Sequence, residues 1–285
     1  MRKSLALLLA LFALSSMGAA ASAGTSDVAD AAQMTTVEQV GDEDMIPVYP
    51  ESLRDGEYPV TVESSSSMFR IESAVLTVKD GAMSAVLTMS GKSYLYVYPG
   101  TAQAAASADE SAFVPFVENA DGAHTFTIPV EALDAPVSCA AYSRNKELWY
   151  DRSLLFRADS LPVSAFRDGF FTTAVSLGLA DGRYTVAVTL AGGSGKARVQ
   201  SPTVLNVRDG KCTAVIGWSS KNYDYMKVEG EKLLPVPNED NAAFEIPVLF
   251  FDRPMAVIAD TVAMSEPHEI AYTLRFDSES LEAAP

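Results

Sequence analysis

The stretch Val-Leu-Thr-Val-Lys-Asp-Gly at residues 75–81 returns as Val-Leu-Asn-Val-Arg-Asp-Gly at residues 204–210. Three further pairs of segments recur in the same order, namely 55–60 with 181–186, 90–94 with 219–223, and 126–130 with 244–248. The offset between the copies runs from 118 to 129 residues. That is the size of a domain and far above a solenoid repeat of roughly 20–50 residues. We therefore predict two related domains in tandem.

Each copy has the pattern of a β-sandwich. Residues 58–62 and 184–188 alternate apolar and polar, which is the period of a half-buried strand. The Asp-Gly pairs that end the two opening stretches are strong hairpin signals. Segments 126–130 and 244–248 contain a proline, which favours an edge or irregular strand. About seven short strands per copy predict an all-β chain of two tandem immunoglobulin-like β-sandwich domains.

The first copy carries an insertion at residues 100–124. Its alanine-rich part, 101–108, favours a helix by intrinsic propensity. The run Asn-Ala-Asp-Gly at 119–122 predicts a turn. We expect a short helix on one edge of the first sandwich. His124 follows the turn, and we expect a solvated loop residue there.

The N-terminus is typical of a secretion signal. Arg2 and Lys3 precede an apolar run at 5–14 that is too short to span a bilayer, and Ala-Ser-Ala at 21–23 is a cleavage site. We predict a signal peptide at 1–23 and a disordered acidic leader at 24–45. The first domain is expected at 46–158, the second at 159–278 and a short tail at 279–285. The chain should be secreted or held at the cell surface, without a membrane span.

Charge and cysteine content narrow the partners. The chain has 21 Lys and Arg against 37 Asp and Glu, a formal net charge of −16, and loss of Arg2 and Lys3 with the signal leaves −18. This excess repels nucleic acid and anionic membrane surfaces, so neither is favoured as a partner and we predict no nucleic-acid ligand. Cys139 and Cys212 fall in different copies. Export permits a disulfide, but two buried free thiols are the expectation.

The second copy contains an ordered series of motifs. Residues 201–211 read Ser-Pro-Thr-Val-Leu-Asn-Val-Arg-Asp-Gly-Lys, Tyr223 and Tyr225 follow, and 227–230 read Lys-Val-Glu-Gly. The copy ends His-Glu-Ile-Ala-Tyr-Thr-Leu-Arg-Phe at 268–276. In this order the motifs resemble the NEAT (near-iron transporter) domains, exported immunoglobulin-like modules that bind haem. That family ends on Tyr-x-x-x-Tyr-Thr-x-x-Phe, whose first Tyr ligates haem iron. The resemblance places His268 at the ligand position and Tyr272 at the second Tyr.

The first copy matches the same family elsewhere. Residues 63–70, Glu-Ser-Ser-Ser-Ser-Met-Phe-Arg, resemble the Ser- and Met-rich lip helix of NEAT domains. This implies that Ser67 and Met68 line the mouth of a ligand site. Counting back from Phe156, Leu148 stands at the ligand position of this copy. The resemblance covers nearly all of residues 50–276.

The residues themselves allow several kinds of site around His268. Neutral imidazole is a ligand for iron, copper or zinc, and histidine is a common haem ligand. His268 and Tyr272 are four residues apart, so on a regular strand they share a face about 13 Å apart. Met264 with His268 offers a soft pair for copper. The alternative is a surface histidine where a strand begins. Tyr223 belongs to a series of alternating tyrosines that serves either strand packing or a cofactor platform.

No enzyme is predicted, because the sequence contains no Gly-x-Ser-x-Gly, His-Glu-x-x-His, Walker or dinucleotide-binding motif. The leading hypothesis is an exported binding protein for haem or iron acquisition, with haem as the cofactor. Its partners would be haem or another metal-containing small molecule, and a haemoprotein or cell-surface transporter component. The alternative is a cell-surface interaction or adhesion module of two immunoglobulin-like domains without a small-molecule ligand. A carbohydrate- or metal-binding module is a third hypothesis.

Overall fold

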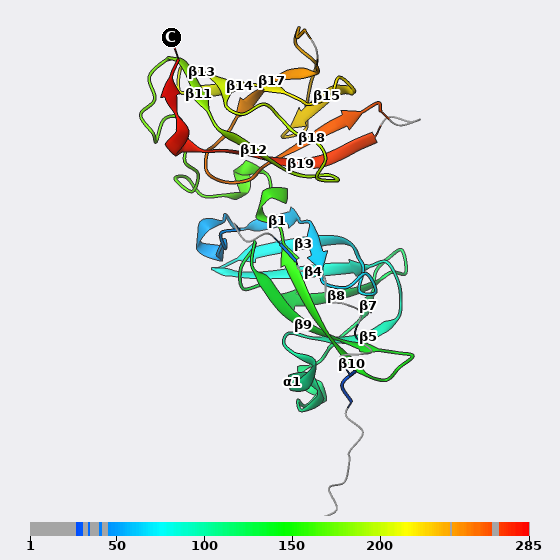
Figure 1. The fold of residues 1–285 in the computed structure, drawn as a ribbon. Coiled ribbons are helices and arrows are strands. Elements are labelled where there is room, and N and C mark those ends of the chain that lie inside the picture. The colour runs from blue at the N-terminus through cyan, green and yellow to red at the C-terminus, as the bar shows by residue number, and fades with distance from the viewer. Residues whose placement is uncertain are drawn as a thin grey trace, which may run out of the picture.

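The computed structural model describes residues 27–30, 34, 40–41, 45–239, 241–263 and 268–284. The predicted signal peptide and most of the leader lie outside these ranges. Four antiparallel sheets of five strands each form two sandwiches, stacked end to end in Figure 1. This confirms the predicted all-β class. None of the helices in the described ranges is long and apolar enough to cross a membrane.

The first sandwich is built from residues 56–156. Its strands are β1 (Gly56–Pro59), β2 (Val62–Ser64), β3 (Ile71–Lys79), β4 (Ala82–Met89), β5 (Tyr94–Tyr98), β6 (Val114–Pro115), β7 (Val117–Glu118), β8 (His124–Pro129), β9 (Pro136–Ser143) and β10 (Trp149–Phe156). One sheet has the order β1-β3-β4-β8-β7, and the other has the order β2-β10-β9-β5-β6.

The second sandwich is built from residues 182–283. Its strands are β11 (Gly182–Val186), β12 (Val188–Gly192), β13 (Thr203–Arg208), β14 (Lys211–Gly217), β15 (Tyr223–Val228), β16 (Glu231–Leu233), β17 (Ala243–Val248), β18 (Met255–Thr261), β19 (His268–Phe276) and β20 (Glu282–Ala283). The sheet orders are β17-β14-β13-β11-β20 and β12-β19-β18-β15-β16. Apart from β7 and β20, the strands follow the same order in both sandwiches.

The Asp-Gly pairs form the two predicted hairpin turns. Lys79 pairs with Ala82 between β3 and β4, and Arg208 pairs with Lys211 between β13 and β14. The Asp and Gly of each turn have positive φ, 50° and 77° in the first and 50° and 72° in the second. This is the geometry that makes Asp-Gly a preferred two-residue hairpin turn. The proline strand β17 is an edge strand as expected, whereas the start of β8 is covered by β7.

Each strand predicted at 58–62 and 184–188 is in fact two strands in different sheets. The chain leaves β1 and enters β2 through Thr61, and it leaves β11 and enters β12 through Ala187. The amide at each crossing donates to a serine hydroxyl, Thr61 N to Ser160 Oγ at 2.9 Å and Ala187 N to Ser280 Oγ at 2.7 Å. These serines end matching 3₁₀ turns, η3 (Ala158–Ser160) and η5 (Ser278–Ser280). Apolar and polar residues go on alternating where the chain crosses, so the sequence pattern alone does not reveal the change of sheet.

The insertion of the first sandwich contains the predicted short helix, α1 (Ala102–Ala106), followed by the 3₁₀ turn η2 (Glu110–Ala112). Thr101 caps the helix, its Oγ1 accepting from Ala104 N at 3.2 Å. The helix buries Ala102 against Trp149 in a small cluster of its own. Figure 1 shows α1 at the far end of the first sandwich from the second.

Each sandwich has its own core, and Phe171 contacts both. Cys139 and Cys212 are free and buried, one in each core, as expected. Burial raises the pKa of the Cys139 thiol to about 12, so this thiol is not reactive at neutral pH.

Two further 3₁₀ turns are η1 (Pro50–Ser52), before the first sandwich, and η4 (Val163–Ala165), between the two sandwiches.

Two peripheral segments pair with the sandwiches. In the leader, Val28 forms a parallel bridge with Trp149, and Ala29 is buried with its amide donating to the Trp149 carbonyl at 3.0 Å. Residues 27–29 thus pair with the end of β10, where an edge is otherwise unpaired. In the segment 279–285, β20 pairs with β11.

Candidate functional site

Two tyrosines meet at one end of the second sandwich. Tyr223 begins β15, Tyr272 lies in the middle of β19, and their hydroxyl oxygens are 3.1 Å apart. The Trp218 ring lies 4.2 Å from the Tyr223 ring and 5.2 Å from the Tyr272 ring, centroid to centroid. Burial, together with the hydrogen bond to Tyr272, raises the pKa of Tyr223. The Tyr223 hydroxyl therefore stays protonated at neutral pH.

A β-bulge turns Tyr223 toward this cluster. Regular alternation would put Tyr223 and Tyr225 on one face, but the register shifts between them. Tyr225 points to the exposed face, where its hydroxyl donates to Glu269 at 2.6 Å. This hydrogen bond raises the pKa of Tyr225 to about 12. The alternating tyrosines gave no sign of the bulge, so sequence reasoning missed which of them faces inward.

A glycine-rich loop after β12 lies against Tyr272. A β-carbon at Gly193, which has φ 58°, would stand 2.6 Å from Tyr272 Cε1. One at Gly192, with φ 96°, would stand 2.9 Å from the Ala271 carbonyl oxygen. Both positions therefore require glycine, for conformation and for space. The loop lies directly against Tyr272, which is only 4% exposed.

His268 is the first residue of β19 and is exposed. It pairs with Thr261 of β18, and strand alternation puts it on the same face as Tyr272. The hydrophobic core does not extend along β19 as far as His268. His268 is therefore exposed, whereas Tyr272 is buried. Met264, predicted as a partner of His268, lies outside the described residues. Within the described ranges, no three His, Cys, Asp or Glu side chains gather to hold a metal ion.

Ser67 and Met68 belong to the first sandwich and lie apart from the tyrosine pair. Residues 64–68, called the lip from this point on, form the end of β2 and a turn, so the expected lip helix is wrong. The serines bond the local backbone instead, Ser64 Oγ accepting from Ser66 N at 3.4 Å and Ser66 Oγ from Met68 N at 3.3 Å. Such bonds compete with a helix. Met68 is 66% exposed at the tip of the lip.

The first sandwich has a counterpart of the tyrosine pair beside the lip. Tyr94 begins β5 at a bulge like that of Tyr223, and it is 8% exposed. Four residues before the end of β10 stands Arg152, where β19 has Tyr272. Arg152 Nη2 donates to Tyr94 Oη at 3.2 Å, and Tyr94 Oη donates to the Met68 carbonyl at 3.3 Å. The two sandwiches thus share one position and differ in its chemistry.

His124 is not the solvated loop residue that was expected. It begins β8, is 2% exposed, and stacks on Phe116 with ring centroids 3.7 Å apart. Its Nδ1 lies 3.4 Å from the Tyr94 carbonyl oxygen. The turn at 119–122 reverses the chain between β7 and β8, so Glu118 pairs with His124 and both belong to the sheet. This leaves His268 as the exposed histidine of the two in the chain.

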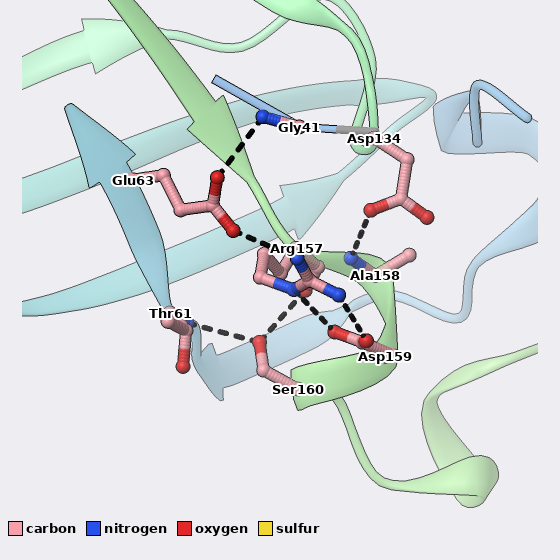
Figure 2. A network of polar contacts seen from close by, with 8 residues as sticks. All are labelled: Gly41, Thr61, Glu63, Asp134, Arg157, Ala158, Asp159 and Ser160. Atoms are coloured by element: carbon pink, nitrogen blue, oxygen red, sulfur yellow. Dashed lines mark hydrogen bonds and ion pairs between the residues drawn. The ribbon is translucent and has the colours of Figure 1, made fainter. Parts of the chain in front are cut away.

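A groove of about 830 Å³ lies between the sandwiches. On the first sandwich it is bordered by Arg157, which binds Glu63 at 2.7 Å and Asp159 at 2.5 Å. Figure 2 shows this guanidinium enclosed by the two carboxylates, with Ser160 and Thr61 beside it. Hydrogen bonding to both acids raises the pKa of Arg157. Its donors are engaged in joining β2 to η3, which is a structural use of this cation.

The opposite wall of the groove is the outer face of β12, β18 and β19. It is made of small side chains, among them Ala191, Ala256, Ala271 and Thr273. Lys227 borders it too, but its ammonium is 2.5 Å from Glu269. Both cations of the groove are therefore neutralised by carboxylates, and the tyrosine pair is the stronger candidate site.

Comparisons with known proteins found likenesses among solved structures alone. No protein-family model matches the chain, and no curated protein matches it. Seven chains among the solved structures match. One is a mutant of IsdX2-NEAT5 in complex with heme, 19% identical over 35% of this chain and 97% of that one, with a TM-score of 0.30. At a TM-score of 0.30, the likeness carries no argument about this chain.

Proposed function

We propose that the chain is an exported, non-enzymatic binding protein for haem, with the ligand site at the end of the second sandwich. The observation that carries the proposal is the Tyr223–Tyr272 hydroxyl pair, 3.1 Å apart. Tyr272 lies against the glycine loop and on the strand that His268 begins. The sequence resemblance of 201–276 to NEAT domains points to the same strand. Haem would be the cargo of this protein and not a resident prosthetic group.

In this proposal, the residues at this end of the second sandwich have different roles in binding haem. Iron held by a porphyrin needs only one or two protein ligands, and the exposed imidazole of His268 can supply one. Tyr223 is protonated, so it serves as a hydrogen-bond donor and not as a phenolate ligand. Tyr272 is buried and acts as a positioning residue, because it holds Tyr223 and supports the glycine loop. Met264, four residues before His268 in the sequence, is a candidate second ligand on that spacing alone.

Titration of the purified protein with haemin, followed by the Soret band, tests the proposal. The wild-type protein should shift the band and saturate near one equivalent. His268→Ala should weaken binding by roughly tenfold or more, the loss of about 1.4 kcal/mol. Arg275→Ala is the matched control, because Arg275 is exposed on the other face of the same strand. It should bind like the wild type.

Two results would contradict the proposal. No Soret shift with the wild-type protein removes haem as the ligand and favours the interaction-module hypothesis. An equal shift in His268→Ala keeps haem but removes this site. In that case Met68→Ala would show whether the lip of the first sandwich holds the haem.

A further inference from the structure

The two sandwiches differ in what covers one outer sheet face. In the first sandwich α1 lies over β9 and β10, and its Ala102 and Ala105 pack against Ala140. Asp151 of β10 holds the start of the helix, its carboxylate accepting from Ala102 N at 2.6 Å. This face therefore binds small apolar side chains, with a carboxylate at one end that accepts an N–H.

The matching face of the second sandwich lacks this cover. Ala271 pairs with Ile258 where Asp151 pairs with Ala140, and Ala271 and Asp151 each stand five residues before the Phe that ends the strand. The two pairs therefore occupy the same place. Whereas α1 follows β5, the chain passes from β15 into β16 through a two-residue turn at 229–230. Within the described ranges, no α-helix lies over this second face.

The uncovered face is one wall of the groove between the sandwiches, which provides both room and access. The volume of about 830 Å³ lies within the range of ligand pockets, roughly 300–1,000 Å³. Ala191, Ala256 and Ala271 of the wall are exposed, so a ligand can reach them from solvent. Their short side chains make this wall apolar and free of protrusions. The groove can therefore hold an apolar group against the sheet.

The charges around the groove have an excess of acid. Arg157 is bound by two carboxylates, as Figure 2 shows, and Lys227 by one. Glu229 lies in the turn that stands in place of α1 and also lines the groove. Its carboxylate has no ion pair or hydrogen bond with the described residues. Counting the partners of both cations, the groove has an excess of two negative charges.

This arrangement selects the class of ligand. An acidic groove attracts a cation and repels an anion, and Glu229 offers an uncommitted carboxylate to a positive group. The alanine wall offers contact to an apolar body. We propose that the groove is a second ligand site, which takes a small organic cation, with its ammonium or amidinium group at Glu229 and its apolar body against the alanine wall. This site does not rest on the proposed binding of haem.

Titration of the whole chain with benzamidine, followed by nitrogen–proton correlation spectra, tests the proposal. Sodium benzoate has the same ring with the opposite charge. Benzamidine should shift the amide resonances of Gly192, Gly230 and Ala271 in a saturable way, and benzoate should not. Glu229→Gln should weaken binding by about two- to fivefold, the range of an exposed ion pair. Glu231→Gln is the matched control, exposed in the same hairpin but outside the groove lining, and it should bind like the wild type.

A substitution that fills the groove completes the test. Ala256 is exposed on the wall, so Ala256→Trp should place a ring in the groove and abolish binding. No saturable shift in the wild type, or binding that survives Ala256→Trp, removes the site. Equal binding of benzoate, or undiminished binding in Glu229→Gln, removes the cation as the ligand class. If Ala256→Trp does not fold, the comparison of benzamidine with benzoate on the wild-type protein decides alone. Neither probe contains iron, so these results do not depend on whether the second sandwich binds haem.

Discussion

One position distinguishes the two sandwiches at the scale of single residues. Arg152 and Tyr272 each stand four residues before the end of a matching strand, and each bonds the hydroxyl of a tyrosine turned inward by a bulge. Tyr223 and Tyr272 are uncharged, and their hydroxyls bond each other. The arginine has a charge without a carboxylate partner among the described residues. The same scaffold therefore places an uncharged polar group at this position in one copy and a cation in the other.

The tyrosine pair should behave as a coupled unit. Tyr223→Phe or Tyr272→Phe leaves one hydroxyl without its partner and should lower the free energy of unfolding by about 1–2 kcal/mol. The double substitution removes both hydroxyls, so its cost should fall about 1 kcal/mol short of the sum. Urea unfolding followed by circular dichroism measures all three. Strict additivity would show that the 3.1 Å contact contributes nothing to stability.

Asp134 should make stability depend on pH. Burial raises the pKa of this carboxyl to about 6, with Asp159 adding to the effect. The folded state then holds the proton more tightly than the unfolded chain, whose pKa is about 4. Stability is therefore highest below about pH 4 as far as this group is concerned, and falls by roughly 2–3 kcal/mol as pH rises through about 6.

Asp134→Asn keeps the oxygen that accepts from Ala158 N and removes the titration. Melting temperatures measured between about pH 4 and 7 should fall with rising pH in the wild type and lose part of that fall in the variant. Asp252→Asn, at the matching position of the second sandwich, controls for the effect of an amide as such. An unchanged slope in Asp134→Asn would show that another group causes the pH dependence.

At the scale of elements, the glycine loop after β12 determines how closely the chain can cover Tyr272. Gly193 and Gly195 both have positive φ, so alanine at either costs about 1 kcal/mol in conformation. The two positions differ in space. A β-carbon at Gly193 would contact Tyr272, whereas nothing lies within 4 Å of a β-carbon at Gly195. Gly193→Ala should therefore destabilise the protein by about 1–3 kcal/mol more than Gly195→Ala. Thermal unfolding of both variants checks this, and equal losses would place the loop away from Tyr272.

The elements show where sequence reasoning works and where it stops. The Asp-Gly turns and the alanine-rich helix were predictable, because their signals are local. The bulges at Tyr94 and Tyr223 were not, since a one-residue shift in pairing leaves no mark on an alternating pattern. The same holds for His124, whose burial depends on β7 pairing with β8. The Ser-rich sequence of the lip is compatible with a capped helix and with a turn. Hydrogen bonds from its own backbone to its serine hydroxyls stabilise the turn.

At the scale of the whole molecule, aromatic stacking joins the sandwiches. Phe171 contacts both cores, and its ring lies 4.1 Å from that of Phe250 at an angle of 15°. Phe166 and Phe170 extend the stack on the side of the first sandwich. Arg253 of the second sandwich covers the Phe170 ring at 4.4 Å. The junction is thus an apolar contact between two separate cores.

Removing the shared ring should uncouple the cores. Phe171→Ala should lower stability by about 2–4 kcal/mol and split a single calorimetric transition into two, since each sandwich has its own core. Phe113→Ala, in the cluster beneath α1, removes a ring of the same kind from the first sandwich alone and should not split the transition. A single transition in Phe171→Ala would mean that other contacts couple the sandwiches.

The central claim is that His268, and not a tyrosine, ligates haem iron at the end of the second sandwich. Electron paramagnetic resonance of the ferric haemin complex, in the wild type and in His268→Ala, tests it most directly, because the signal reports the axial ligand. We predict an imidazole-ligated spectrum that is lost in the variant. A tyrosinate spectrum, or an imidazole spectrum that survives the substitution, would contradict the account.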